Sequence, residues 1–146
     1  MRDIRHRVGI AAASGDIFEA LSEPDRLVGW WAATARRETE PAPRLVLGFP
    51  GFRDLVWDIA EAEFGRRLHL QLHSGPDEWS GSALLFDLAE ADDQVFVTLV
   101  HRTTDATPPD AWQFFCTKWP LFLVSLKDFL ETGSGSPYPN DVRIQH

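Results

Sequence analysis

Residues 110–131, DAWQFFCTKWPLFLVSLKDFLE, constrain the fold of this chain more than any other stretch of its sequence. Large apolar side chains recur there at spacings of three and four, which places them along one side of an α-helix. They are Trp112, Phe115, Trp119, Phe122, Leu126 and Phe129. The chain has six Trp and ten Phe residues, and five of these sixteen aromatic residues share this side. The pattern therefore predicts a long helix that packs against a broad apolar surface.

The ends of this helix and one irregularity inside it are also marked in the sequence. Asp110 is the expected N-cap, and Gly133 is placed to end the helix. The polar residues expected on the opposite side are Lys118, Ser125 and Asp128. Pro120 removes a backbone donor, so it predicts a kink near residues 116–119, or a short first helix followed by the main one.

Length and composition favour one globular domain. With 146 residues, 44% of them hydrophobic and 25% charged, the chain can bury a core without disulfides. We expect a single domain over residues 1–137. Residues 138–146 follow a Gly-, Ser- and Pro-rich segment and are expected to form an irregular tail.

Charge and cysteine content exclude several classes of partner and compartment. The net charge of −8 argues against binding to nucleic-acid phosphates, because few cations would be available to replace their counterions. Cys116, the single cysteine, cannot form an internal disulfide and fits a reducing cytosol. The opening sequence MRDIRHRVGI lacks the apolar run of a signal peptide, and no segment approaches a transmembrane span. We therefore expect a cytoplasmic protein that does not insert into membranes.

The remainder of the chain predicts one strand, two short helices and then about six strands. The first strand is expected at residues 4–10, and the helices at 14–21, capped by Ser14, and 24–29, with Pro24 at its start. Alternating apolar residues and turn signals place the later strands at 32–37, 44–49, 55–63, 67–73, 79–89 and 94–103. This order predicts an α+β fold in which one helix lies across a curved antiparallel sheet. A strongly bent sheet that grips an apolar helix tends to leave space at one end.

Five segments, in this order, resemble one known family. The first is similar to its opening strand and helix, and the second, EPDRLVGWW, to its proline, short helix and tryptophan pair. The next two resemble its central hairpin and a strand that ends in histidine, and the last its closing helix with a Gly-x-Gly-x-Pro exit. The segments are residues 8–21, 23–31, 59–72, 95–101 and 119–137.

The family is the SRPBCC superfamily (START and birch-pollen-allergen-like), in its branch related to the activator of heat-shock-protein-90 ATPase. The resemblance implies a helix-grip fold, in which a curved antiparallel sheet of six to seven strands wraps around a long C-terminal helix. It also implies a hydrophobic cavity between the helix and the sheet. Members bind lipids, sterols or polyketides, some are aromatase/cyclases and a few are hydrolases. Pro120 inside the helix departs from the family pattern.

The aromatic side of the helix and the expected fold together predict a ligand cavity. The alternative is a fully packed core, because aromatic rows at helical spacing usually pack. The residues expected to line the cavity are Trp30, Trp31, Trp57, Phe86, Leu99, His101, Trp112, Phe115, Trp119 and Phe122.

His101 is the polar residue of most interest in this set. It shares a strand face with Val95, Val97 and Leu99, so it is expected to point toward the helix. A neutral imidazole there could orient a ligand or act as a general base. The alternative is a structural histidine bonded to a backbone carbonyl at the end of the strand.

Other polar candidates have weaker support. His69 and His73 share a strand face but lie too far apart to bind one metal ion, and the outer surface is their expected place. Glu61 and Glu63 could form a carboxylate pair, although a position near a hairpin end favours solvation. Cys116 has no nearby base and is expected to be a buried packing residue. Neither an HExxH nor a CxxC motif is present, so we expect no metal and no cofactor.

The sequence leaves three functional hypotheses. The leading one is a carrier or sensor that binds a small hydrophobic molecule, lipid or aromatic and polyketide-like, in the cavity. The second is a cyclase/aromatase-like or hydrolase-like enzyme that uses the same cavity. The third is an interaction module that resembles the chaperone-ATPase activator. A homodimer is also conceivable, through an edge strand and Trp79.

Overall fold

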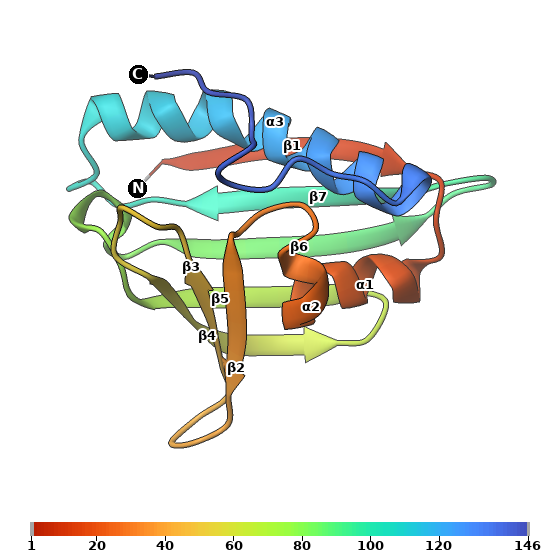
Figure 1. Ribbon diagram of the computed structural model, residues 1–146, viewed down its shortest axis with the longest axis horizontal. Coiled ribbons are helices and arrows are strands. Elements are labelled where there is room, and N and C mark those ends of the chain that lie inside the picture. Colours follow the sequence, from red (N-terminus) through yellow and green to blue (C-terminus); the bar gives the residue numbers. More distant parts are fainter. Residues whose placement is uncertain (1, 146) are drawn as a thin grey trace.

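The computed structural model describes residues 2–145 of the chain and confirms the α+β helix-grip architecture (Figure 1). Its elements are β1 (Asp3–Ile10), α1 (Ser14–Ser22), α2 (Pro24–Leu27), β2 (Thr34–Glu38), β3 (Arg44–Gly48), β4 (Leu55–Glu63), β5 (Arg67–Ser74), the 3-10 turn η1 (Asp77–Trp79), β6 (Ala83–Glu90), β7 (Val95–Arg102) and α3 (Pro109–Thr132). Met1, the first residue of the expected domain, and His146, the last residue of the expected tail, lie outside the described residues.

The seven strands form one antiparallel sheet in the order β1-β7-β6-β5-β4-β3-β2. In Figure 1, β2 and β3 run across the direction of β5, β6 and β7, so the sheet is strongly bent. The pairing of β4 with β5 contains two register shifts, at Val56/Trp57 and Ile59/Glu61. Such irregularities increase the local twist and bend of a strand.

The predicted apolar side of α3 packs into the hollow of this sheet. Phe115, Trp119 and Leu126 are almost fully buried and belong to one core cluster with Val97 and Leu99 of β7. Burial of such side chains contributes about 1.5–3 kcal/mol each. The aromatic periodicity of residues 110–131 therefore determines which side of the helix faces the sheet.

The two ends of α3 differ in how well the sequence predicted them. The helix begins at Pro109 after an extended Pro108, and no side chain caps it. Asp110 therefore lies inside the first turn, and its prediction as the N-cap is wrong, because Pro109 already supplies a helical φ at the first position. Gly133 ends the helix as predicted, in a left-handed conformation with φ of 88°.

Pro120 lies within one continuous helix, so the predicted alternative of two separate helices is wrong. The proline is exposed on the outer side of α3. Solvent can hydrate the Cys116 carbonyl, which has lost its helical partner, and tertiary packing of the opposite side holds the two halves together.

Ser125 is a second correction, because it is 4% exposed rather than on a solvated side. Its hydroxyl donates to the Trp30 carbonyl at 2.8 Å and accepts from the Ser136 amide at 2.7 Å. The helix packs so closely here that a Cβ on Gly29 would lie 2.3 Å from the Phe129 ring. A small hydroxyl side chain fits this contact and links α3 to the segments on both sides.

One predicted helix cap and two predicted strand starts differ from the structure, each for a local reason. Ser14 does not cap α1, since its hydroxyl bonds Glu90 at 3.4 Å instead. The strand expected at 32–37 begins at Thr34, because the amides of Trp31 and Ala32 both bond the Leu27 carbonyl and extend the preceding turn. The strand expected at residue 79 begins at Ala83, since the residues before it form η1 and a turn.

Residues 138–145 form no helix or strand and are packed against the domain. The Tyr138 amide donates to the Trp31 carbonyl at 3.0 Å, and the Tyr138 hydroxyl donates to the Pro50 carbonyl at 2.6 Å. Figure 1 shows this dark blue segment running back along α3. Among the helices within residues 2–145, none has the length and apolar character needed to cross a membrane.

Candidate functional site

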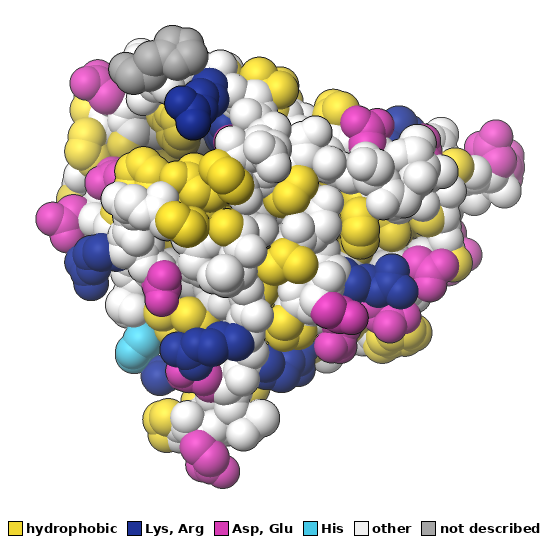
Figure 2. All heavy atoms as spheres, viewed as in Figure 1, with side chains coloured by type: hydrophobic (Ala, Val, Ile, Leu, Met, Phe, Trp, Pro, Cys, Tyr) yellow, Lys and Arg dark blue, Asp and Glu magenta, His cyan; other side chains and the backbone are white. Residues whose placement is uncertain are grey.

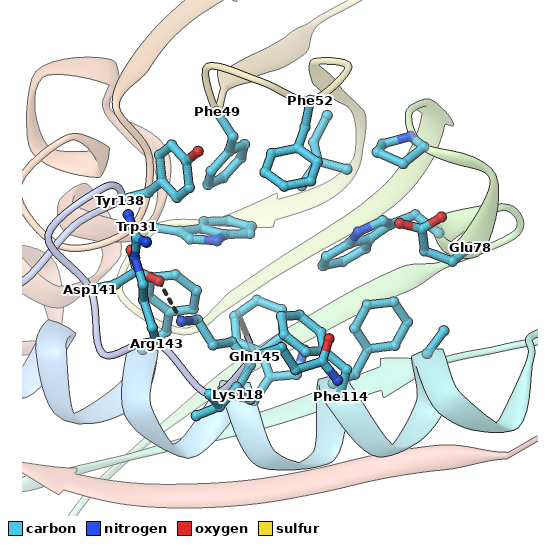
Figure 3. A pocket seen from close by; sticks show the side chains of 18 of the residues that line it. Trp31, Phe49, Phe52, Glu78, Phe114, Lys118, Tyr138, Asp141, Arg143 and Gln145 are labelled. Carbon is cyan, nitrogen blue, oxygen red and sulfur yellow. Dashed lines mark ion pairs between the residues drawn. The ribbon is translucent and has the colours of Figure 1, made fainter.

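A pocket of about 700 Å³ opens at the end of the sheet where α3 begins. Five segments form its walls: Trp31 in the loop after α2, the turn between β3 and β4, the region of η1, the N-terminal part of α3, and the C-terminal tail. Figure 2 shows hydrophobic side chains reaching the surface on this face, and Figure 3 shows how they surround the opening. Of the residues that line it, only Leu55 belongs to a strand, so this pocket lies between α3 and the loops at the end of the sheet.

The pocket walls are mainly aromatic. Nine lining side chains carry rings: Trp31, Phe49, Phe52, Trp79, Phe114, Phe115, Trp119, Phe122 and Tyr138. Several of the rings contact one another, and the centroids of Trp31 and Trp119 are 5.3 Å apart. Concave sites of this size with mainly apolar walls are typical of small-molecule binding.

Charged side chains lie around and within the opening. They are Arg53, Glu78, Asp110, Lys118, Asp141 and Arg143. The Lys118 ammonium pairs with the Asp141 carboxylate, and the two side chains are 12% and 10% exposed. The Lys118 ammonium also donates to the Val142 carbonyl, so one lysine of α3 holds the tail across the pocket (Figure 3).

His101 lies behind the aromatic wall, where it is fully buried and does not line the pocket. Its ring stacks on Trp79 with centroids 5.2 Å apart. The Trp119 indole N–H donates to Nδ1 at 3.1 Å, and Nε2 lies 2.8 Å from the Ser82 hydroxyl. Because an indole nitrogen only donates, Nδ1 is the unprotonated acceptor, and Nε2 carries the hydrogen and donates to Ser82.

This hydrogen-bond polarity decides what His101 can do. A general base needs a free lone pair, and the only one on the neutral ring is taken by Trp119. Ser82 and His101 are therefore not a nucleophile and its base, since the proton already lies on the nitrogen that faces the serine. Burial lowers the pKa of His101 to about 4, which keeps the ring neutral at physiological pH.

The structure places the predicted cavity residues in three different environments. Four of them line the pocket: Trp31, Phe115, Trp119 and Phe122. Others are packed in the core, and these are Trp30, Trp57, Phe86, Leu99 and His101. Trp112 is half-buried outside the pocket, with the Arg2 guanidinium 5.1 Å from its ring centroid.

Sequence reasoning missed the residues that close the other sides of the pocket. Phe49 and Phe52 belong to a glycine-proline turn, where two large apolar residues are unusual and could have signalled a site. Tyr138, the only tyrosine, stands between two prolines in a polar tail. Trp79 is part of the pocket wall, so it is not a free surface residue for a dimer interface, as the sequence had suggested.

The remaining polar candidates lie away from the pocket. His69 and His73 are half-buried and exposed, respectively, on the outer sheet face, where carboxylates flank them. Glu61 and Glu63 are exposed, and each pairs with an arginine. Within residues 2–145, no group of three or more His, Cys, Asp or Glu side chains is arranged to hold a metal ion.

Cys116 is only partly buried, on α3 outside the pocket lining. Loss of hydration raises the pKa of its thiol above the usual value. A thiol of this kind is less reactive than an ordinary surface cysteine at neutral pH.

Fold and pocket together define the class: a helix-grip domain with an aromatic pocket at one end of its long helix. Solved structures agree. The Aha1 dimer from Colwellia psychrerythraea is 30% identical to this chain, with a TM-score of 0.78. The aligned region covers 92% of this chain and 100% of the Aha1 chain. CalU16 from Micromonospora echinospora is 22% identical, with coverages of 89% and 74% and a TM-score of 0.72.

An AHSA1-like protein from Rhizobium etli is 20% identical, with coverages of 99% and 92% and a TM-score of 0.72. No protein-family model and no curated protein matches the chain. The 30% identity over a complete Aha1 chain shows the family. This protein belongs to the SRPBCC superfamily, in its Aha1-related branch.

Proposed function

We propose that this protein is a cytoplasmic carrier or sensor that binds a small, flat hydrophobic molecule in the aromatic pocket. The observation that carries the proposal is the pocket itself, about 700 Å³ in volume and lined by nine aromatic side chains. Burial of apolar ligand surface would drive binding, at about 25 cal/mol per Å² before the cost of ordering the ligand. The rigid helix and sheet supply a largely preformed site.

Fluorescence titration with 1-pyrenebutanol, a neutral flat aromatic probe, tests this proposal. Trp31, Trp79 and Trp119 line the pocket, so a bound pyrene should quench tryptophan emission saturably. Ala111→Phe places a ring into the pocket from α3 and should weaken binding by about tenfold or more. Val124→Phe adds the same ring on the exposed side of the helix and should leave affinity unchanged.

Two results would contradict the proposal. One is an absence of saturable quenching, and the other is equal weakening by Ala111→Phe and Val124→Phe. Mass spectrometry of the recovered probe and of natural molecules that co-purify with the protein separates a carrier from an enzyme. A carrier returns its ligand unchanged, whereas a cyclase-like or hydrolase-like enzyme returns a product.

A second candidate function, protein association, is favoured by one comparison. The Aha1 protein of Colwellia psychrerythraea, 30% identical to this chain, was solved as a dimer. We expect a dimer of this protein as well, and light scattering on a size-exclusion column would measure it directly. A monomeric mass at every concentration tested would contradict this expectation.

A further inference from the structure

Lys118 is the least exposed of the three basic residues that line the pocket. Its side chain is 12% exposed, whereas Arg53 is 66% exposed and Arg143 is also on the surface. The ammonium lies 5.2 Å from the centroid of the Phe122 ring. An ammonium among aromatic side chains is poorly hydrated, so it requires a negatively charged or strongly polar partner.

In this structure the partner comes from the chain's own tail. The Asp141 carboxylate and the Val142 carbonyl both accept from the Lys118 ammonium. Ile144, three residues after Asp141, lines the same pocket. One short segment therefore supplies a carboxylate and an apolar side chain to the site together.

We infer that the natural ligand of this pocket is an anionic amphiphile, a flat apolar molecule with a carboxylate, and that Asp141 holds the place of that carboxylate on Lys118. The inference rests on the proposed function, because it names the chemical class of ligand for the same pocket. The tail is then an internal competitor, which the ligand displaces from the lysine.

The placement of the two charges favours an anionic over a cationic ligand. Lys118 belongs to α3, which packs in the core, so it stays in the pocket wall when the tail moves. Asp141 belongs to a segment without helix or strand, so its carboxylate leaves the pocket when the ligand displaces this segment. Glu78 lies across the pocket from Lys118 (Figure 3), and Asp110 is two helical turns away at the exposed start of α3.

A matched pair of probes tests this inference: 1-pyrenebutyrate, which carries a carboxylate, and 1-pyrenebutanol, which does not. Asp141→Asn removes the internal carboxylate, and Lys118→Met removes the cation but keeps an apolar stem. The double variant Lys118→Met/Asp141→Asn removes both charges, so neither is left buried alone. Asp128→Asn changes the net charge equally at an exposed position of α3 and is the control.

Asp141→Asn should bind pyrenebutyrate about tenfold more tightly than the wild-type protein, because the freed ammonium is available to the probe. Lys118→Met and the double variant should lose the preference for pyrenebutyrate over pyrenebutanol. The quantity to compare is the ratio of the two affinities in each variant, because release of the tail changes the pocket for both probes. Asp128→Asn should behave as the wild type.

Each contrary outcome has a separate meaning. If both probes bind but no variant shows a preference for the carboxylate, the inference is wrong and the proposed function stands. Equal tightening of both probes by Asp141→Asn also overturns it, since the tail would then only block the opening. If neither probe binds any variant, the proposed function fails, and the inference fails with it.

Discussion

Trp119 connects the pocket to the core, because its ring lines the pocket while its indole N–H bonds the buried His101. His101 in turn donates to Ser82, so three side chains from α3, β7 and the segment before β6 form one buried polar chain. Every polar atom of the imidazole has a protein partner. His101 is therefore a positioning residue for the pocket wall, and the hydrogen bonds do not support its expected roles as a ligand contact or base.

The lowered pKa of His101 makes the stability of the protein depend on pH. The folded pKa is about 4, against the usual 6.5, so the unfolded chain binds more protons between these values. The contribution of the buried, neutral His101 to the free energy of unfolding is fully present above about pH 6.5 and is lost as the pH falls through about 4. Between pH 7 and pH 5 the expected loss from this group is about 2 kcal/mol.

Denaturant unfolding of the wild type and of His101→Gln at pH 7 and pH 5 measures this contribution. Gln does not titrate, so the stability advantage of the wild type over the variant should shrink by about 2 kcal/mol at the lower pH. Val124→Ala, which replaces an exposed side chain that does not titrate, should retain the pH dependence of the wild type. An advantage that does not change with pH would show that His101 is not buried as a neutral ring.

At the scale of the element, α3 combines a core surface with a pocket surface. Its middle packs against β7, and Ala111, Phe114 and Phe115 in its first half face the pocket. Pro120 lies between these parts but on the outer side. The helix continues through the proline because its buried side is held by packing, which outweighs one missing backbone bond.

Replacement of Pro120 with alanine should therefore stabilise the protein. Alanine restores the amide donor to the Cys116 carbonyl and has a helix propensity about 3 kcal/mol better, partly offset by the greater freedom of the unfolded chain. We expect a gain of about 1–2 kcal/mol in the free energy of unfolding. Pro109→Ala, at the start of the helix, should bring no gain, because proline is favourable there. A loss of stability in Pro120→Ala would show that the proline shapes the helix as the core requires.

At the scale of the whole molecule, the bend of the sheet produces the pocket. β2 and β3 turn across the other strands (Figure 1), and the turn between β3 and β4 places Phe49 and Phe52 opposite α3 (Figure 3). Phe52 remains 64% exposed at the opening. The tail closes the remaining side, so segments from residues 31 to 145 meet at one site.

A ligand that binds this site only in the folded protein must stabilise the whole domain. At a free concentration about 100 times its dissociation constant, 1-pyrenebutanol should raise the free energy of unfolding by about 2.7 kcal/mol. A thermal scan should show the corresponding rise in Tm for the wild type and for Val124→Phe, with little or none for Ala111→Phe. A rise of the same size in all three proteins would place the bound probe outside the pocket.

Local patterns were sufficient for the fold and for one wall of the site. Helical spacing identified Phe115, Trp119 and Phe122 as one side of α3, and alternation identified Val97, Leu99 and His101 as the inner face of β7. These predictions succeed because side-chain direction within an element follows from its backbone period. The same periods cannot say which inward side chains pack solidly and which border empty space. Trp57 and Trp79 differ in this way, since Trp57 is packed in the core and Trp79 lines the pocket.

By itself, the sequence determined the long aromatic helix, the antiparallel strands, the order of these elements along the chain and the family, because these depend on periodicity and on short motifs. Only the tertiary structure decided where the pocket lies, that His101 has both ring nitrogens occupied, and that the tail joins Asp141 to Lys118. Each of these depends on contacts between residues far apart in the chain. Their geometry is set by the bend of the sheet and the packing of side chains, which no local pattern encodes.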